Sequence, residues 1–266
     1  LLTYPDNPTI QSIIDRYQSQ RSEYEFTTTD KRLHYVWLIT DASDIQIIRT
    51  AFAEMNALYI ADGHHRSASS CLLAERLKKD NKDHTGDEPY NYFMSYLIPE
   101  SHLKIAEFNR LVKDLNGLSK EEFLIKLDEW FRIENKGHQL YRPSKQHHFS
   151  MYLDGEYYSL YLRKSIYKFS DSLSELDAEI LYRTVLRPIL GIKNLRNSKR
   201  ISYSHGKNDV FKLKEKVDSG AFQVAFGLVP ATIDQLKAIA DANLQMPPKS
   251  TYIEPKLRSG LIMYEF

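Results

Sequence analysis

The stretch that most constrains the fold runs from Leu58 to Ser70, where a short apolar segment passes through a polar turn into a helix. The turn reads Asp62-Gly-His-His-Arg66, and its glycine accepts the positive φ that a tight turn requires. The spacing of the small and apolar residues that follow predicts a helix over 67–79 that buries Cys71. We therefore expect a strand, a tight turn and a helix, in that order.

The composition is typical of a soluble globular protein and excludes several functional classes. The chain has 266 residues and a net charge of +1, so its charge gives no argument for nucleic acid or an anionic membrane as a partner. No apolar run approaches the roughly 20 residues of a membrane span. The single cysteine excludes an intrachain disulfide and favours a reducing, cytoplasmic location. The expected partner is a small-molecule substrate, and the sequence leaves the oligomeric state open.

Short strands alternate with helices without a regular βαβ rhythm, which predicts an α+β fold of mixed sheets with packed helices. Capping-box patterns begin helices at Ser119, Ser174 and Thr232. The pair Asp154-Gly155 lies between two apolar runs and predicts a tight β-hairpin. The run 261–266 is expected to close the chain as a strand.

The domain organisation is predicted from the same order of strands and helices. Residues 1–30 are interpreted as the helical remnant of a longer N-terminal region, and residues 31–266 as the main α+β domain, with a subdivision near 100–170. The chain opens with Leu1 rather than methionine, which favours a fragment of a longer protein.

The turn after Ile60 combines several groups that bind anions. The start of the following helix offers unpaired N–H groups and a partial positive charge, and Arg66 adds a planar fork that grips a phosphate. Ser67 adds a hydroxyl, and His64 and His65 can donate hydrogen bonds or move a proton. Asp62 is a candidate ligand of Mg²⁺ or a base. The alternative is a plain loop with two solvent-facing histidines and an ion pair between Arg66 and Asp62.

A second constellation spans 246–257, where Pro247 and Pro248 exclude a helix and stiffen the chain. Its cations and hydroxyls would cover phosphates or a carboxylate, and they are Lys249, Ser250, Thr251 and Lys256. The alternative is a structural crossover with a solvated lysine.

Two further groups of polar residues carry weaker signals. Asn109 and Arg110 lie beside an apolar run and are candidates for a polar site, but a surface ion pair is the commoner explanation for such residues. Asp177 and Glu179 open a predicted helix, where carboxylates complement the helix dipole. Cys71, at helical core spacing, is interpreted as buried rather than nucleophilic.

The motifs Tyr59-Ile-Ala-Asp-Gly-His-His-Arg66 and Met246-Pro-Pro-Lys-Ser-Thr-Tyr252, with Pro255-Lys-Leu257 and Ser259-Gly-Leu261, resemble the family catalogued as domain of unknown function 1015. The resemblance extends from about Lys31 to the C-terminus. Many relatives have a histidine at the position of Asn109, so the resemblance implies no catalytic role for that residue here. Relatives are often encoded beside serine-biosynthesis enzymes, which favours a small amino acid or its phosphate as the ligand.

The box from Gly63 to Arg66, followed by Ala68, is similar to the phosphate-binding box of the ParB/sulfiredoxin superfamily. There a glycine, an arginine and a small residue at a helix start hold the phosphates of a nucleotide, and the superfamily includes free-serine kinases. The similarity implies a nucleotide-binding core of that type.

The leading hypothesis is a nucleotide-dependent phosphotransferase that acts on a small metabolite such as serine and uses Mg²⁺ with ATP or ADP. In it Asp62 and His64 are catalytic, and Asp62 holds the metal or acts as base. The residues that bind the phosphates are Gly63, His65, Arg66, Ser67, Lys249, Ser250, Thr251 and Lys256. Two alternatives use the same turn: a non-catalytic sensor of a nucleotide or phosphorylated metabolite, and a hydrolase of small phosphoesters.

Overall fold

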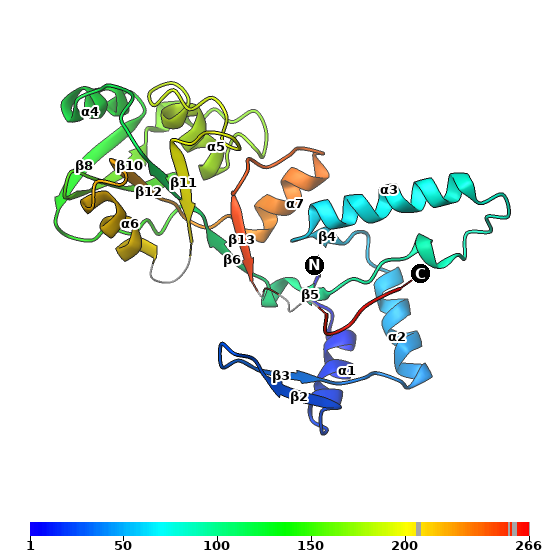
Figure 1. The fold of residues 1–266 in the computed structure, drawn as a ribbon. Helices are drawn as coiled ribbons and strands as arrows, with labels where there is room; N and C mark the ends of the chain where they lie inside the picture. Colours follow the sequence, from blue (N-terminus) through cyan, green and yellow to red (C-terminus); the bar gives the residue numbers. More distant parts are fainter. Residues whose placement is uncertain (206–208, 255, 257–259, 266) are drawn as a thin grey trace. The chain divides into compact units, whose positions relative to one another are not determined.

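The computed structural model describes residues 1–205, 209–254, 256 and 260–265 and divides into two compact units. The N-terminal unit comprises Leu1–Leu103 and Lys256–Phe266, and the central unit comprises Lys104–Pro255. Helices and mixed sheets occur together, which confirms the α+β class (Figure 1). The predicted boundary at residue 30 and the subdivision near 100–170 stay predictions.

The N-terminal unit is built on a three-stranded sheet in which β1 pairs antiparallel with β4 and parallel with β5. A separate antiparallel hairpin is formed by β2 and β3. In chain order the elements are β1 (Leu2–Tyr4), α1 (Pro8–Gln18), β2 (Tyr24–Thr27), β3 (Leu33–Val36), α2 (Ala42–Ala53), β4 (Tyr59–Ile60), α3 (His64–Asp80), the 3₁₀ turns Pro89–Asn91 and Glu100–His102, and β5 (Leu97–Pro99).

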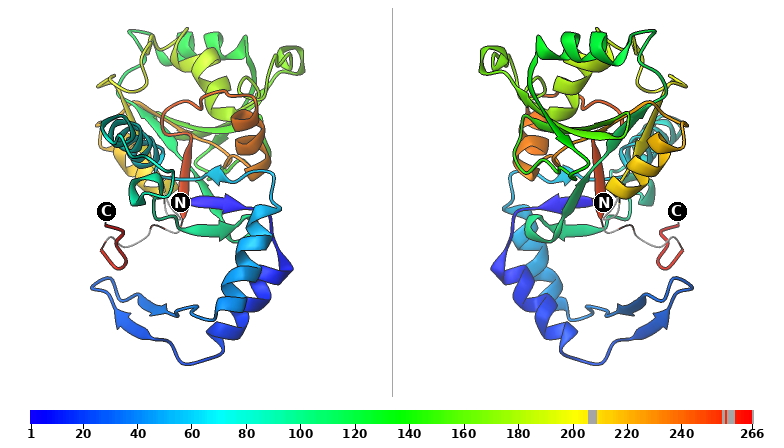
Figure 2. Two further views of the ribbon diagram at one scale, coloured as in Figure 1. Left: turned by 90° about the vertical axis from the view of Figure 1, so that its right-hand side faces the viewer. Right: turned by 90° about the vertical axis from the view of Figure 1, so that its left-hand side faces the viewer.

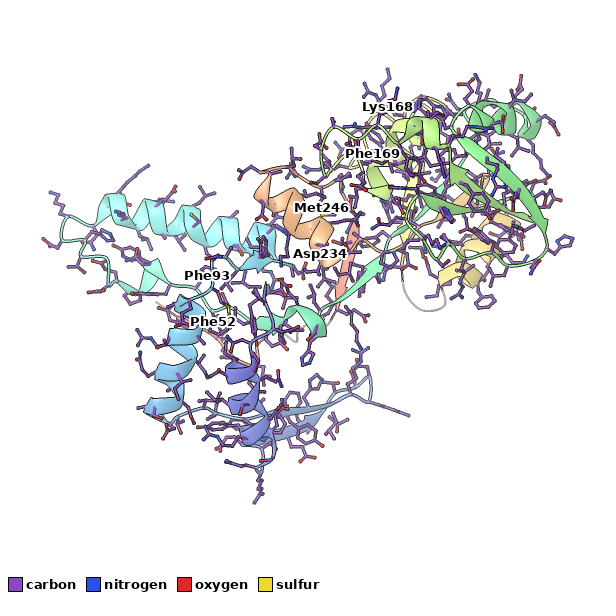
Figure 3. All side chains as sticks on the ribbon, turned by 180° about the vertical axis from the view of Figure 1, so that it is seen from behind. Phe52, Phe93, Lys168, Phe169, Asp234 and Met246 are labelled. Carbon is purple, nitrogen blue, oxygen red and sulfur yellow. The ribbon has the colours of Figure 1, made fainter. Side chains whose placement is uncertain are left out.

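Helices α1 and α2 lie side by side in both ribbon views (Figures 1 and 2). Arg16 of α1 donates to the carboxylate of Asp44 in α2, and the Tyr17 hydroxyl donates to the same carboxylate at 3.0 Å. The ring of Phe52, labelled in Figure 3, packs edge-on against Tyr4 with the ring centroids 5.0 Å apart. A small apolar core and one buried carboxylate thus join the two helices to β1.

The central unit is built on a six-stranded antiparallel sheet in the order β11-β7-β12-β9-β10-β8. A second, two-stranded sheet pairs β6 with β13. The elements are β6 (Lys104–Glu107), β7 (Asn109–Val112), α4 (Lys120–Asp128), β8 (Phe131–Gly137), β9 (His148–Leu153), β10 (Glu156–Leu162), the 3₁₀ turn Lys164–Ile166, α5 (Asp177–Leu181), a π-helical turn Tyr182–Leu186, β11 (Ile201–Ser204), α6 (Asp209–Asp218), β12 (Val224–Gly227), α7 (Ile233–Asp241) and β13 (Thr251–Glu254).

Both faces of the six-stranded sheet are covered. Side chains alternate between the two faces along a strand, so Val112 joins a large core with α4 and α5, while Leu111 joins a smaller core with α6. Figure 1 shows the corresponding arrangement, with α4 and α5 on one side of the sheet and α6 on the other. Every residue of β7 is buried as a result, including two polar ones.

Asn109 of β7 points to the α6 side, where it joins three elements. Its amide nitrogen donates to Asp209 at 2.6 Å, and its amide oxygen accepts the N–H of Leu228 at 3.0 Å. The Ser204 hydroxyl also donates to Asp209, which is 1 % exposed. Buried polar groups must be paired within the protein, so Asn109 links β7 to the start of α6 and to the end of β12.

Two kinds of local prediction are confirmed. Ser119 and Thr232 each cap a helix with a complete capping box. Asp154 and Gly155, with φ of 51° and 80°, connect β9 to β10 in an antiparallel hairpin. No helix among the described residues has both the length and the apolar character needed to cross a membrane.

Three local predictions are wrong. Helix α3 starts at His64 rather than at residue 67, and Cys71 is exposed because polar and charged residues interrupt the apolar stripe of this helix, which buries no residue. Ser174 does not cap α5, since its hydroxyl accepts the N–H groups of Ser170 and Asp171. Residues 261–265 form no strand, and Phe266 lies outside the described residues.

The Asn109 link predicts a large stability effect in the central unit. Asn109→Ala removes the hydrogen bonds that Asn109 makes to Asp209 Oδ2 and to the Leu228 N–H, and both groups are buried, so we expect a loss of about 3 kcal/mol in unfolding free energy. Urea unfolding is followed by the fluorescence of Trp130, which packs against the large core, in a Trp37→Phe background. Asn197→Ala, at an exposed position, is the control and should stay within about 0.5 kcal/mol. A loss below about 1 kcal/mol for Asn109→Ala would contradict the assigned link.

Candidate functional site

The strand-to-helix turn in the N-terminal unit is fixed by backbone hydrogen bonds to Leu1, the residue directly before β1. The N–H groups of Ala61 and Asp62 both donate to the carbonyl of Leu1, at 3.0 and 3.2 Å. Gly63 then adopts a left-handed conformation with φ of 88°, which an L-residue adopts only at a cost of about 1–2 kcal/mol. The sharp reversal at Gly63 allows α3 to begin at His64, directly after β4.

The start of α3 has no side-chain cap. Helices α1, α2, α4 and α7 are capped by side chains that accept hydrogen bonds from their first turns, namely those of Asn7, Asp41, Ser119 and Thr232. A helix start without such a cap leaves its first N–H groups for water or for a ligand, and these groups carry the positive end of the helix dipole. The first turn of α3 is therefore available to an anion.

Two cationic side chains lie around the Asp62 carboxylate at this helix start. The guanidinium of Arg66 folds back over Gly63, where a Cβ atom would stand 3.1 Å from Nη2. The same Nη2 lies 3.8 Å from Asp62 Oδ2, and Lys256 Nζ donates to that oxygen at 3.1 Å. The absence of a side chain at Gly63 is thus what lets Arg66 approach the turn.

The electrostatic balance at Asp62 favours its charged form. Partial burial by itself would raise the pKa of the carboxyl, but the hydrogen bond from Lys256, the charges of Lys256 and Arg66, and the N–H of Gly63 outweigh it and lower the pKa below its usual value. A carboxylate of this kind is a weak base near neutral pH. It is better suited to binding a cation.

A hollow of about 250 Å³ adjoins the first turns of α3. Gly63, Arg66 and Ser67 line it on the helix side. Its other lining residues are mostly apolar, and they include Phe93, which Figure 3 labels, Met94 and Tyr264. The sequence does not predict this apolar wall, because no local pattern groups exposed aromatic residues that lie far apart in the chain.

The two histidines of the turn are exposed, and within the described residues neither His64 nor His65 makes a hydrogen bond or an ion pair. This exposure and the Arg66–Asp62 pair are features that the plain-loop interpretation also expects. That interpretation does not account for the position of Lys256, which comes from the other end of the chain.

The other residues of the second constellation belong to the central unit. Lys249 has a φ of 57°, its carbonyl accepts a hydrogen bond from Arg110 at 3.2 Å, and its Nζ lies 5.5 Å from the ring centroid of Phe108. The Ser250 hydroxyl donates to the Pro247 carbonyl at 2.7 Å, and Thr251 opens β13.

Of the predicted phosphate-binding residues, the structure brings Gly63, Arg66, Ser67 and Lys256 together with Asp62. Lys249 and Ser250 lie near Arg110, and Thr251 pairs with Glu107 in the β6–β13 sheet. The segment starts at Met246, which packs against the large core (Figure 3). A single site formed by both constellations stays a prediction. Pro255, Leu257 and Ser259 of the related motif lie outside the described residues.

Among the described residues, no three histidine, cysteine, aspartate or glutamate side chains are grouped closely enough to hold a metal ion. Mg²⁺ in nucleotide sites commonly takes one or two carboxylates and completes its shell with phosphates and water. Asp62 fits the part of a single protein ligand, provided that Lys256 gives up its hydrogen bond.

The fold and the turn define an α+β protein with a candidate anion-binding helix start. The chain belongs to the family described as "Protein of unknown function (DUF1015)", whose model matches residues 1–179. The matched range contains the turn at Asp62–Arg66 and ends before the segment that starts at Met246. A search of curated proteins found no match.

Solved structures with similarity to this chain include a free serine kinase in complex with AMP, at 12 % identity and a TM-score of 0.38, which covers 95 % of this chain and 82 % of that one. A variant of a free serine kinase in complex with ADP covers 95 % and 83 %, at 12 % identity and a TM-score of 0.37. A conserved hypothetical protein from Pyrococcus furiosus covers 95 % and 86 %, at 10 % identity and a TM-score of 0.39.

The Asp62–Lys256 hydrogen bond predicts the direction of a pKa change. In Lys256→Met the carboxyl loses its hydrogen bond and one neighbouring charge while its partial burial remains, so the pKa of Asp62 should rise. The measurement is the carboxyl ¹³C chemical shift of Asp62 as a function of pH. Lys256→Arg retains the charge and should leave the pKa low. An unchanged titration in Lys256→Met would show that Lys256 does not hold this carboxylate in solution.

Proposed function

We propose that the chain binds a nucleotide by its phosphates at the start of α3 and transfers a phosphoryl group to a small metabolite. The observation that carries this proposal is the uncapped first turn of α3, with Arg66 folded over Gly63 and Lys256 beside it, at the edge of a 250 Å³ hollow. Backbone N–H groups at a helix start and a guanidinium are the groups that hold phosphates most often.

The hollow supports a nucleotide rather than inorganic phosphate. The aromatic residues Phe93 and Tyr264 line it together with Met94, and flat apolar surfaces of this type suit a nucleobase. The resemblance of the Gly63–Ala68 box to the phosphate-binding box of the ParB/sulfiredoxin superfamily agrees with this assignment and with a core of that type.

Within the proposal, each residue of the turn has a distinct role. Arg66, Ser67 and the backbone at Gly63 hold the phosphates, and His65 donates to a phosphate oxygen. His64 stabilises the charge that develops on the transferred group, because phosphoryl transfer depends mainly on positioning and electrostatics. Asp62 carries Mg²⁺ once the arriving phosphates have drawn Lys256 away.

A non-catalytic sensor is a second candidate, and one observation favours it. Asp62 is already held by two cations, and its lowered pKa makes it a poor base. A protein that only binds a nucleotide or a phosphorylated metabolite needs the cations and the helix start but no free carboxylate. The proposed phosphotransferase needs a small phosphoryl acceptor, for which serine is the first compound to test. A sensor needs no such acceptor.

The proposal predicts that Arg66 dominates nucleotide binding. Arg66→Ala removes charge-assisted hydrogen bonds of about 1.5–3 kcal/mol, so the affinity for ATP or ADP should fall about 10- to 150-fold in calorimetric titration with Mg²⁺. Gly63→Ala should weaken binding as well, because its Cβ meets the guanidinium. Arg76→Ala, on the exposed surface of the same helix, is the matched control. No binding by the unmodified chain, or binding unchanged in Arg66→Ala, would overturn the proposal.

Turnover separates the two candidate functions. For a phosphotransferase, Asp62→Asn should retain most of the ATP affinity and lose at least about 100-fold in phosphoryl transfer to serine or another small acceptor, since the metal loses its carboxylate. Transfer is measured with γ-labelled ATP over a panel of amino acids and hydroxy acids. ATP binding without transfer to any acceptor in the unmodified chain would favour the sensor.

A further inference from the structure

The hairpin of β2 and β3 in the N-terminal unit exposes apolar side chains to solvent. None of the residues in the two strands is buried, and Figures 1 and 2 show the hairpin extending from the ends of α1 and α2. Large side chains at Tyr24, Leu33, Tyr35 and Leu38 are 46–57 % exposed. A two-stranded hairpin by itself is at best marginally stable in water, and further strands or a packed helix are needed to stabilise it. The hairpin therefore has the character of an incomplete sheet.

Two aromatic stacks give the hairpin a defined structure, one on each face. The ring of Phe26 stacks on His34 with the centroids 5.0 Å apart, and the ring of Tyr35 stacks on Trp37 at 5.6 Å. Successive side chains of a strand point to opposite faces, so the two stacks lie on different sides. The Trp37 indole N–H donates to the carbonyl of Gln20 at 3.0 Å, which ties the base of the hairpin to the segment after α1. A further strand would thus meet an edge whose register is already set.

The outer edge of β3 has backbone groups available for pairing. Among the described residues, the β2–β3 sheet has no third strand. The carbonyls of Arg32 and Val36 each accept a backbone N–H from the β2 side. Backbone groups alternate in direction along a strand, so those of Leu33 and Tyr35 point away from β2. Edge strands are usually protected by charged residues, proline or bulges, but residues 33–40 contain no Asp, Glu, Lys, Arg or Pro.

We propose that this edge pairs with the same edge of a second copy of the chain, in an antiparallel arrangement with the two-fold axis at Tyr35. Each Tyr35 then lies opposite the other, and Leu33 of one copy lies opposite Trp37 of the other. The outward-pointing backbone groups of the two edges face one another and form the hydrogen-bonded pairs of an antiparallel ladder. The edge is complementary to itself, as a two-fold interface requires. The product is a four-stranded sheet in the order β2-β3-β3-β2.

The distribution of charge favours a second copy as the occupant. Glu25 is the single Asp, Glu, Lys or Arg residue within the two strands, and it lies opposite Tyr35 inside the hairpin. In the four-stranded sheet the two Glu25 side chains are three strand spacings apart, or about 14 Å. This distance exceeds the Debye length of about 8 Å at physiological salt, so their repulsion is largely screened. An edge without charge offers a charged partner segment no complementary group.

The exposed area indicates a weak and reversible dimer. Since a large aromatic side chain buries about 150–250 Å², the four half-exposed side chains of the hairpin offer roughly 400 Å² per copy. A stable interface of standard size buries about 800 Å² per partner. The hairpin supplies about half of that area, so we expect a dissociation constant of the order of 10–100 μM.

The first test is sedimentation velocity of the full chain over about 1–500 μM, where we expect a reversible monomer–dimer equilibrium. Tyr35→Lys places two ammonium groups directly opposite one another and should weaken the dimer at least about 10-fold. Ile125→Lys is the matched control, because it replaces another exposed apolar residue, 70 % exposed on α4, and should leave the equilibrium unchanged.

The second test is disulfide cross-linking in a Cys71→Ser background, which removes the single native thiol. Tyr35→Cys places two thiols across the axis with Cα atoms about 5.5 Å apart, a separation that a disulfide spans. We expect a covalent dimer after mild oxidation, detected on a non-reducing gel. Glu25→Cys, at the same level of the hairpin but on β2, is the control and should stay monomeric on the gel because its thiols lie about 14 Å apart.

Each outcome decides the proposal. A dimer that weakens in Tyr35→Lys, together with cross-linking in Tyr35→Cys, supports it. A chain that is monomeric at every concentration overturns it, and so does a dimer that Tyr35→Lys and Ile125→Lys affect equally or a Glu25→Cys variant that cross-links as readily as Tyr35→Cys. A monomer whose Tyr35 N–H is protected from hydrogen exchange would show that another segment of the same chain covers the edge, which also overturns the proposal. None of these measurements depends on nucleotide binding.

Discussion

The coverage of the six-stranded sheet on both faces is the constraint on which the central unit depends. An antiparallel sheet with one face in water can place its polar side chains there, but β7 has no such face. Asn109 and Arg110 are therefore buried on opposite sides, and each must find its partners inside the protein. Asn109 finds them in Asp209 and the Leu228 N–H. Arg110 donates to two carbonyls and, among the described residues, has no counter-charge.

The turn before α3 differs from β7 because its charged side chains are exposed to solvent. Its cations are exposed, so their interactions are weakened by water and salt, and a single ion pair there contributes little to stability. What the turn offers is geometry: a glycine that permits the reversal, a helix start without a cap, and an arginine held over both. An exposed site of this type suits a large, highly charged ligand that supplies much of its own binding energy.

How far the sequence predicts this structure depends on the range of the interaction that decides each element. Ser119 and Asp154-Gly155 were predicted well because a cap and a tight turn are decided by residues two or three positions apart. Cys71 was misplaced because helical spacing indicates a face but not whether anything covers it. The four residues of β7 are two polar residues followed by two apolar ones, a pattern that does not alternate as in a strand with one face in water. All four are buried because both faces of the sheet are covered. For the candidate site, the turn and Lys256 were identified from their chemistry, but the hollow beside α3 depends on contacts between segments that no local pattern connects.

The lowered pKa of Asp62 also implies that, in the proposed function, the phosphate binds before Mg²⁺ does. Arg66 and Lys256 are the groups that a phosphate would attract, and both are engaged with Asp62 in the structure. A phosphate that binds at the helix start must therefore compete with the carboxylate for these two cations. Once it succeeds, Asp62 is left ionised and without its partner, which is the state in which a carboxylate binds Mg²⁺. In the proposed function the metal site thus forms only as the nucleotide binds, so a carboxylate that looks neutralised in the free protein is consistent with a role in phosphoryl transfer.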